Sequence, residues 1–403
     1  MMTTEQKTIP KGWQVKTIDD VSLVFKGKGL SKDKIGSSGK NKCILYGQLF
    51  TTYNEIIREV KSKTDFDEGV RSQNGDVLMP GSTTTKAEDL AIASAILEDN
   101  VLLGGDINIL RKKDDAYDPI FLAYYLTHYK RQEVGNFGQG ITIIHLYGRD
   151  IRKIQLALPP LFEQKRIVEI LSTVDDEIQK TNKVISQTEK LKKGLIQDLF
   201  TKNNKIKKLK IKDVSEVTSS KRVMVSDYVD EGIPFYRSTE IIKKSKNIPL
   251  TDLLYISAEK FNFFKNRFGA PEKGDILITA VGTIGDVYMV QNEVFYFKDG
   301  NTIWVRKIKD SVLPEYLRMI LGSNFYREKL NNIAGGSSQK ALTIQKLENV
   351  EVPVPSISEQ KKLIEVISSV ENKTKVYIQT KNNLDQLKKG LAQDLLSGKV
   401  RTK

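Results

Sequence analysis

The chain carries one sequence signature twice, PPLFEQK at residues 159–165 and PSISEQK at residues 355–361. A second pair of segments, LKKGLIQDL at 191–199 and LKKGLAQDL at 387–395, has the same offset of 196 residues. Between 159–202 and 355–398, 15 of 44 aligned positions are identical, where chance would give about two or three. The chain therefore contains an internal repeat.

The repeat divides the chain into four segments. The segments before each repeat copy have diverged, although GDVL at 75–78 still resembles GDIL at 274–277. We expect two globular domains and two spacer helices, with the order 1–158, 159–205, 206–354 and 355–403.

Each copy of the repeat predicts one long helix. A proline opens each copy, and no glycine or proline interrupts 161–193 or 357–389. Apolar side chains recur with heptad spacing, which is typical of a helix that packs against another helix. Helices over 163–200 and 359–396 would each be about 57 Å long at 1.5 Å per residue. The predicted helix-pair interface consists of Ile167, Leu171, Val174, Ile178, Ile185, Leu363, Ile367, Val370, Tyr377 and Leu384.

The two helices are expected to pair with each other. A compact domain lies between them, and the termini of a compact domain tend to lie close together. The chain would then enter the second helix beside the end of the first, which makes the pair antiparallel. A parallel coiled coil between two chains is the alternative.

The globular segments mix short strands with short helices. Strands are expected at 75–79, 107–110, 274–280 and 303–305, and helices with an early proline at 119–128 and 314–321. The predicted fold class is α+β, with two globular domains separated by an antiparallel coiled coil in a pseudo-twofold repeat.

Composition narrows the possible functions. The chain has 403 residues, 64 Lys and Arg, 50 Asp and Glu, and a formal net charge of +14. This excess favours a polyanionic partner such as nucleic acid, although a basic surface also serves solubility. One cysteine, Cys43, and two histidines, His128 and His145, argue against a disulfide framework and any His- or Cys-rich metal site. No apolar run of transmembrane length occurs, and we expect a cytoplasmic protein that does not enter a membrane.

Candidate DNA contacts fall in basic segments and in loops that recur in both halves. Gly, Gln, Ser, Thr and Lys in loops suit phosphate and base-edge contacts, although ordinary turn chemistry explains each loop alone equally well. The candidates are Lys26, Lys28, Lys32, Lys34, Thr83, Thr84, Lys86, Gln139 and Thr142 in the first half, and Lys221, Arg222, Arg237, Thr279, Thr283, Ser338, Gln339 and Lys340 in the second.

None of the candidate catalytic motifs has the full set of residues that its chemistry requires. GSSGKN at 36–41 has the wrong glycine spacing for a phosphate-binding loop, and GNFGQG at 135–140 inverts the dinucleotide fingerprint. LPPL at 158–161 lacks the flanking residues of an amino-methyltransferase loop. We expect no active site and no bound cofactor or metal on this chain.

The doubled P-x-x-x-E-Q signature, each copy opening a long helix, resembles the specificity subunit of type I restriction–modification systems. The lead-in IPKGW at 9–13 is similar to the start of a first target-recognition domain, whereas KLK at 208–210 departs from it. The resemblance extends over nearly the whole chain.

That resemblance implies that each variable domain reads one half of a split target in double-stranded DNA. It implies that the helices set the gap and dock two methyltransferase subunits carrying S-adenosylmethionine. Restriction subunits using ATP and magnesium would complete the complex. Two other classes stay open from residues alone: a self-contained methyltransferase or nuclease, and a homodimeric structural or regulatory DNA-binding protein without methyltransferase partners.

Overall fold

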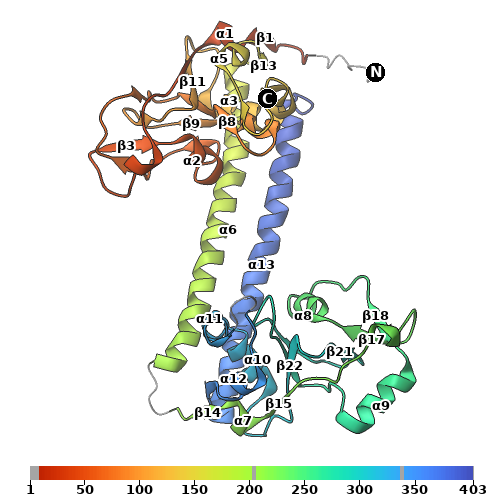
Figure 1. Cartoon of the computed structure of the whole chain (residues 1–403). Coiled ribbons are helices and arrows are strands. Elements are labelled where there is room, and N and C mark those ends of the chain that lie inside the picture. Colours follow the sequence, from red (N-terminus) through yellow and green to blue (C-terminus); the bar gives the residue numbers. More distant parts are fainter. Residues whose placement is uncertain (1–8, 202–205, 336–339, 403) are drawn as a thin grey trace. The chain divides into compact units, whose positions relative to one another are not determined.

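A computed structural model describes residues 9–201, 206–335 and 340–402. The chain forms two compact units, coloured by sequence in Figure 1. Unit 1 combines residues 1–182 with 379–403, and unit 2 comprises residues 183–378. Each unit thus contains one globular part and a stretch of both long helices. The four segment boundaries expected from the repeat stay a prediction, because this division follows packing and not the repeat.

The two long helices are confirmed as α6 (Leu161–Thr201) and α13 (Ile357–Leu396). Each begins within its signature, one or two residues after the last proline, where a missing backbone N–H costs no helical hydrogen bond. At the start of α13, the Glu359 carboxylate accepts a hydrogen bond of 2.9 Å from the backbone N–H of Ser356. Both helices continue through Gly194 and Gly390 near their C-terminal ends, where an isolated glycine is tolerated.

The helices run antiparallel within each unit, as expected from the sequence. In unit 1, two ion pairs join residues of α6 to α13 and the segment after it; in unit 2, one hydrogen bond and one ion pair join the helices. These contacts are Glu163–Arg401 at 2.6 Å, Asp175–Lys388 at 2.7 Å, Thr188–Thr374 at 3.1 Å and Lys192–Glu371 at 2.6 Å. The α13 partner moves towards lower numbers as the α6 residue advances, which defines the direction.

Unit 1 is built on antiparallel-rich sheets with short helices. Its strands form a five-stranded sheet in the order β2-β11-β7-β9-β4, a four-stranded sheet β5-β3-β10-β6, and the pairs β1-β13 and β12-β8. The expected strands at 75–79 and 107–110 correspond to β7 and β11. The strands are β1 (Gln14–Thr17), β2 (Ser22–Lys26), β3 (Asn41–Ile44), β4 (Ile56–Ile57), β5 (Lys63–Thr64), β6 (Val70–Arg71), β7 (Val77–Pro80), β8 (Ser82–Thr83), β9 (Ser94–Ile96), β10 (Leu102–Leu103), β11 (Ile107–Lys112), β12 (Ile144–His145) and β13 (Gln155–Leu158).

The short helices of unit 1 include the one expected at 119–128. Asp118 caps it by accepting hydrogen bonds from the backbone N–H groups of Ile120 and Phe121, and a π-helical turn at 125–129 continues it. The helices are α1 (Ile18–Val21), α2 (Tyr46–Thr51), α3 (Pro119–Tyr124), α4 (Arg131–Gly135) and α5 (Gly148–Ile151), with 3₁₀ turns at Lys32–Lys34 and Ala87–Ala91.

Unit 2 repeats this plan with fewer strands. Its sheets have the orders β15-β22-β19-β20 and β16-β18-β17-β21, and β14 pairs with β23. The expected strands at 274–280 and 303–305 correspond to β19 and β22. The strands are β14 (Lys208–Lys210), β15 (Glu216–Thr218), β16 (Tyr228–Val229), β17 (Ile233–Tyr236), β18 (Leu254–Ile256), β19 (Ile276–Thr279), β20 (Val287–Met289), β21 (Tyr296–Phe297), β22 (Thr302–Arg306) and β23 (Glu351–Pro353).

The expected helix at 314–321 of unit 2 is confirmed with those bounds, and Pro314 is its first residue. The helices are α7 (Ile211–Val214), α8 (Ser238–Ser245), α9 (Ala258–Phe268), α10 (Pro314–Leu321), α11 (Asn324–Ile333) and α12 (Ile344–Glu348), with a 3₁₀ turn at Val225–Asp227.

Each unit buries parts of both long helices in its main core. In unit 1, Ile167 and Leu171 of α6 share a core with Leu395 and Leu396 of α13 and with α3. In unit 2, the corresponding core includes Ile196 of α6 and residues of α13 and α10. Full burial of such a side chain contributes about 1.5–3 kcal/mol, so the helix ends are integral to each globular part. Figure 1 shows the strands of unit 1 gathered around the first turns of α6.

Candidate nucleic-acid interface

The two loops of unit 1 that the sequence singles out lie side by side. Strand β8 pairs with β12, placing Thr83 opposite Ile144 and Ser82 opposite His145. The loop between Gln139 and His145 is closed by a β-bridge between those two residues. The pairing brings segments about 60 positions apart in sequence into one surface.

The same pairing recurs in unit 2. Val281 and Gly335 both form bridges with Ala341, so the segment around 279–283 meets Ala341 beside Gly335. Two of the predicted contact residues of this loop, Ser338 and Gln339, lie outside the described residues. Lys340 is exposed at its end.

Within these loops, not every predicted contact residue faces solvent. Thr84, Lys86, Thr142 and Thr283 are exposed, as is Gln139, whose amide donates to Asp150 at 3.0 Å. Two threonines are buried instead. Thr83 shares a hydrogen bond of 2.8 Å with Thr85, and Thr279 donates to the carbonyl oxygen of Thr283 at 2.6 Å. Both buried hydroxyls shape their loops.

The four lysines of the basic segment at 26–34 are exposed, whereas Leu30 between them is buried. Lys26 forms an ion pair of 3.2 Å with Asp106, and Lys34 lies 4.4 Å from the centre of the Phe66 ring. Lys28 and Lys32 have no ion pair with the part of the chain that the structure describes. They are available for phosphate contacts.

The predicted basic residues of unit 2 are less free. Arg222 pairs with Asp299 at 3.3 Å, and Lys221 stacks over Phe268 at 5.0 Å. Arg237 donates from Nη2 and Nε to the buried Glu240 carboxylate at 2.7 and 3.1 Å. Its guanidinium is therefore engaged within the domain, where it supports the start of α8.

The predicted helix-pair residues are all buried or partly buried. Ile167, Leu171, Val174 and Ile367 are at most 9% exposed. The remaining six are partly buried: Ile178, Ile185, Leu363, Val370, Tyr377 and Leu384.

The glutamine of each signature attaches the globular part to its helix. The fully buried Gln164 side chain accepts a hydrogen bond of 2.7 Å from the N–H of Asp118 and donates to the carbonyl oxygens of Ala116 and Pro159. These bonds hold the start of α3 against the start of α6.

Gln360 makes the same set of bonds in unit 2. It accepts a hydrogen bond of 2.8 Å from the N–H of Leu313 and donates to the carbonyl oxygens of Ser311 and Pro355, both at 2.9 Å. In the sequence, this glutamine is distinguished only as part of the P-x-x-x-E-Q signature. Its repetition at the same offset was the signal that could have revealed a structural role.

A buried polar cluster joins the globular part of unit 1 to both helices. Lys388 of α13 contacts Asp175 of α6 at 2.7 Å and Glu55 at 3.0 Å. His128 also hydrogen-bonds Glu55, and the Tyr124 hydroxyl donates to Asp175 at 2.5 Å. We call these five residues the closed junction.

Electrostatics within the closed junction favour its charged forms. Burial alone would raise the pKa of Glu55, but the hydrogen bond from His128 and the charge of Lys388 outweigh burial and lower that pKa to about 2. Burial would likewise lower the pKa of Lys388, but Glu55 and Asp175 raise it. No sequence pattern announced this cluster.

The loop around residues 141–147 also carries an exposed apolar tip that the sequence did not predict. Ile141 is 99% exposed, and Ile143 and Tyr147 beside it are exposed as well. Arg149 lies over the Tyr147 ring at 5.3 Å. Apolar side chains on a nucleic-acid interface can contact thymine methyl groups, so this tip belongs to the candidate surface.

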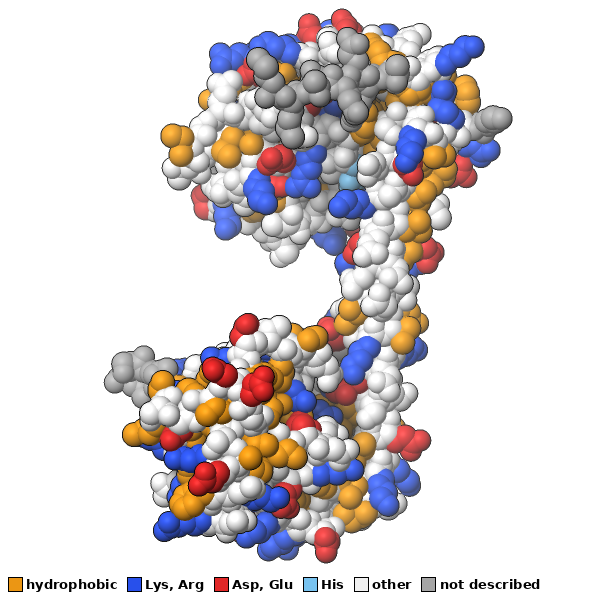
Figure 2. Space-filling view, turned by 90° about the vertical axis from the view of Figure 1, so that its right-hand side faces the viewer, with side chains coloured by type: hydrophobic (Ala, Val, Ile, Leu, Met, Phe, Trp, Pro, Cys, Tyr) orange, Lys and Arg blue, Asp and Glu red, His pale blue; other side chains and the backbone are white. Residues whose placement is uncertain are grey.

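Charge is spread over the surface. Figure 2 shows Lys and Arg side chains interspersed with Asp and Glu on the face that it presents of each unit. Among the described residues, no group of three or more His, Cys, Asp or Glu side chains is arranged to hold a metal ion. No helix within the described ranges has both the length and the apolar character needed to cross a membrane.

Each unit therefore carries a matching loop pair and attaches its globular part to a stretch of both long helices. Comparisons with known proteins identify the class. A family model described as the type I restriction modification DNA specificity domain matches residues 10–190 and 203–386. The chain belongs to this family and is a non-catalytic DNA-specificity subunit of the type I class.

Individual relatives agree with this assignment. A putative type I restriction enzyme MjaX specificity subunit from Methanocaldococcus jannaschii is 25% identical, with 99% of this chain and 96% of the relative covered. The putative specificity subunit S.HindORF215P from Haemophilus influenzae is 27% identical, covering 77% and 78%. The crystal structure of an S subunit from M. genitalium has a TM-score of 0.59 at 17% identity over 98% of both chains, which shows the shared fold.

Proposed function

We propose that each globular part reads one half of a bipartite target in double-stranded DNA. The observation that carries this proposal is the recurrence of one loop pair: 82–86 beside 138–145 in unit 1, and 279–283 beside Gly335 and Ala341 in unit 2. The exposed Thr84, Lys86 and Thr142 of the first pair offer hydrogen-bond donors to phosphates and base edges. Lys28 and Lys32 add charge for the backbone.

The helix pair, in this proposal, sets the gap between the half-sites and docks two methyltransferase subunits. Two exposed leucines support a doubled docking surface, Leu191 on α6 at 53% exposure and Leu387 on α13 at 49%. They occupy equivalent positions of the repeat, so a contact that a partner makes with one helix at this position could recur on the other.

The chemistry is assigned to the partners. The methyltransferase subunits would carry S-adenosylmethionine and methylate adenine, and restriction subunits would use ATP and magnesium to cut unmodified DNA. The complex would work in the cytoplasm. This chain would contribute recognition alone.

Lengthening both helices tests the spacing role. Inserting one heptad after Asn182 and another after Ile378 adds about 10 Å to each helix, equivalent to about three base pairs. We expect mapping of methylated adenines across a genome to show a longer gap with both half-sites unchanged. An unaltered gap would refute the spacing role.

Exchanging one globular part tests independent reading. Replacing residues 1–158 with the corresponding domain of another family member should change one half-site and leave the other and the gap as they were. A change in both halves would contradict the proposal. A chain that forms a stable homodimer and ignores methyltransferase subunits would instead support the regulatory DNA-binding alternative.

A further inference from the structure

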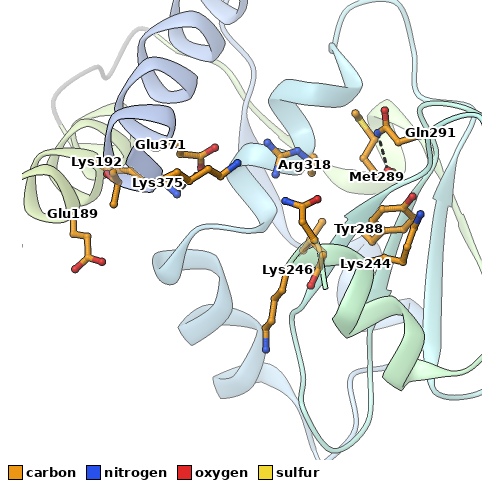
Figure 3. Close-up of a pocket in the computed structure, with 14 residues that line it drawn as sticks. Glu189, Lys192, Lys244, Lys246, Tyr288, Met289, Gln291, Arg318, Glu371 and Lys375 are labelled. Carbon is orange, nitrogen blue, oxygen red and sulfur yellow. Dashed lines mark hydrogen bonds and ion pairs between the residues drawn. The ribbon is translucent and has the colours of Figure 1, made fainter. Parts of the chain in front are cut away.

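Unit 2 contains a cavity where its globular part faces the helix pair. It has a volume of about 650 Å³ and is lined by the end of α8, by β20, by α10 and by both long helices. Cavities of this size hold ligands or inserted side chains in other proteins. Figure 3 shows its side chains, with Arg318 between those of the helix pair and those around Tyr288.

The cavity has an excess of positive charge. Five cationic side chains line it, against the carboxylates of Glu189 and Glu371; the cations are Lys192, Lys244, Lys246, Arg318 and Lys375. Two of the five have acidic partners: Lys192 pairs with Glu371 at 2.6 Å, and Lys244 with Glu293 at 3.2 Å.

The other three cations are uncompensated. Lys246, Arg318 and Lys375 have no ion pair and no side-chain hydrogen bond to the described part of the chain. Arg318 is partly buried on α10, where a charge without a partner is costly. Lys246 and Lys375 are exposed and solvated, but their charges add to the positive potential around Arg318, which an anion in the cavity would offset.

The repeat itself indicates the kind of anion. Lys192 and Glu371 occupy the positions equivalent to Lys388 and Asp175, which form the same cross-helix pair in unit 1. In unit 1, a carboxylate from outside the helices, Glu55, completes that pair at 3.0 Å from Lys388. In unit 2, the cavity beside the equivalent pair is lined by the cations Lys246, Arg318 and Lys375 instead of by such a carboxylate.

We propose that this cavity receives an acidic side chain of a methyltransferase subunit docked on the helix pair. The inference rests on the proposed function, because it assumes such docking. A carboxylate entering the cavity beside Lys192 would take the part that Glu55 plays beside Lys388 in unit 1, and Arg318 in the cavity lining offers paired donors suited to a carboxylate. The equivalent pair in unit 1 favours a protein carboxylate over a DNA phosphate.

Charge reversal in the cavity tests the inference. The full chain carrying Arg318→Glu and Lys375→Glu is titrated with the purified cognate methyltransferase subunit and, separately, with a random-sequence DNA duplex. We expect at least a tenfold loss of affinity for the methyltransferase and less than a twofold change for DNA. Arg318→Gln with Lys375→Gln should give a smaller loss in the same direction.

Lys375→Glu alone is compared with Lys373→Glu as its matched control, since Lys373→Glu makes the same single charge reversal two residues away on α13, and Lys373 is exposed and outside the cavity lining. Lys373→Glu should change the methyltransferase affinity less than twofold. Thermal unfolding of each variant shows whether the fold is retained. Ser245→Glu, which supplies a carboxylate from the chain's own cavity wall, should also weaken docking.

The outcomes are separable. An unchanged methyltransferase affinity in the folded charge-reversal variant overturns the inference and leaves the proposed function standing. A tenfold loss of DNA affinity with unchanged methyltransferase affinity also overturns it and assigns the cavity to phosphate. Failure of the unaltered chain to bind the methyltransferase refutes the docking role itself.

Discussion

Unit 1 and unit 2 contain equivalent salt bridges between the two long helices, but the surroundings of these salt bridges differ. In unit 1, the side chains of Lys388 and Asp175 are 14% and 11% exposed, and the globular part covers them. In unit 2, Lys192 and Glu371 are 38% and 28% exposed and line a cavity. The repeat preserved the pair, while the diverging globular parts decided its surroundings. Because the value of an ion pair depends on desolvation, equivalent residues should differ in energetic weight.

The largest difference should follow removal of the lysine. Lys388→Met leaves Glu55 and Asp175 buried without their shared cation, which should lower the free energy of unfolding by about 3–5 kcal/mol. Lys192→Met removes a more exposed partner and should cost about 1 kcal/mol or less. Urea denaturation followed by circular dichroism measures both. Equal losses would show that burial does not distinguish the two junctions.

A smaller effect, with a defined pH dependence, should follow Glu55→Gln. The folded-state pKa of Glu55, about 2, lies below its ordinary value of 4.5. Its contribution is therefore complete above about pH 4.5 and is lost as the pH falls towards 2. At pH 7 the variant should be less stable by about 3 kcal/mol.

The comparison of wild type with Glu55→Gln across pH supplies the check. Urea denaturation from pH 7 down to pH 3 should show the stability difference between the two proteins shrinking below about pH 4.5. A difference that stays constant with pH would mean that the carboxylate is not held charged by His128 and Lys388.

The smallest effect concerns the seam between the helices. In unit 2, Thr188 and Thr374 share a hydrogen bond of 3.1 Å, whereas the equivalent positions in unit 1 are Leu384 and Ile178. Transplanting that apolar pair as Thr188→Leu with Thr374→Ile should raise the free energy of unfolding by about 1 kcal/mol.

The single substitutions serve as controls for the seam. Each replaces one hydroxyl and leaves the other beside an apolar side chain, so each should gain less than half of the effect of the pair. A loss of stability in the double variant would indicate that the hydroxyl pair contributes more than the added apolar contact.

The parts of the fold with a local cause were predictable. Both long helices follow from an uninterrupted heptad pattern bounded by proline, and β7, β11, β19 and β22 from short apolar runs after turns. The closed junction had no such signal, because Lys388 and Glu55 are 333 positions apart. Only the folded globular part brings them together.

Predictions for the contact loops were limited by the same non-local pairing. The positions of the loops followed from residue type and from recurrence in both halves. Whether a hydroxyl faces solvent depends on the strand pairing that forms later, and that pairing buries Thr83 and Thr279. Arg237 was likewise predicted to contact DNA, but its guanidinium is bonded to Glu240, three residues further along the chain.

The buried glutamines have a consequence for how such proteins diversify. Gln164 and Gln360 bond to backbone groups of the globular parts and of their own signature prolines, and to no side chain among the described residues. Because backbone groups do not depend on the side chain, these glutamine hydrogen bonds do not require particular amino acids in the globular part. Recombination that exchanges a whole globular part therefore leaves the glutamine hydrogen bonds to the long helix intact.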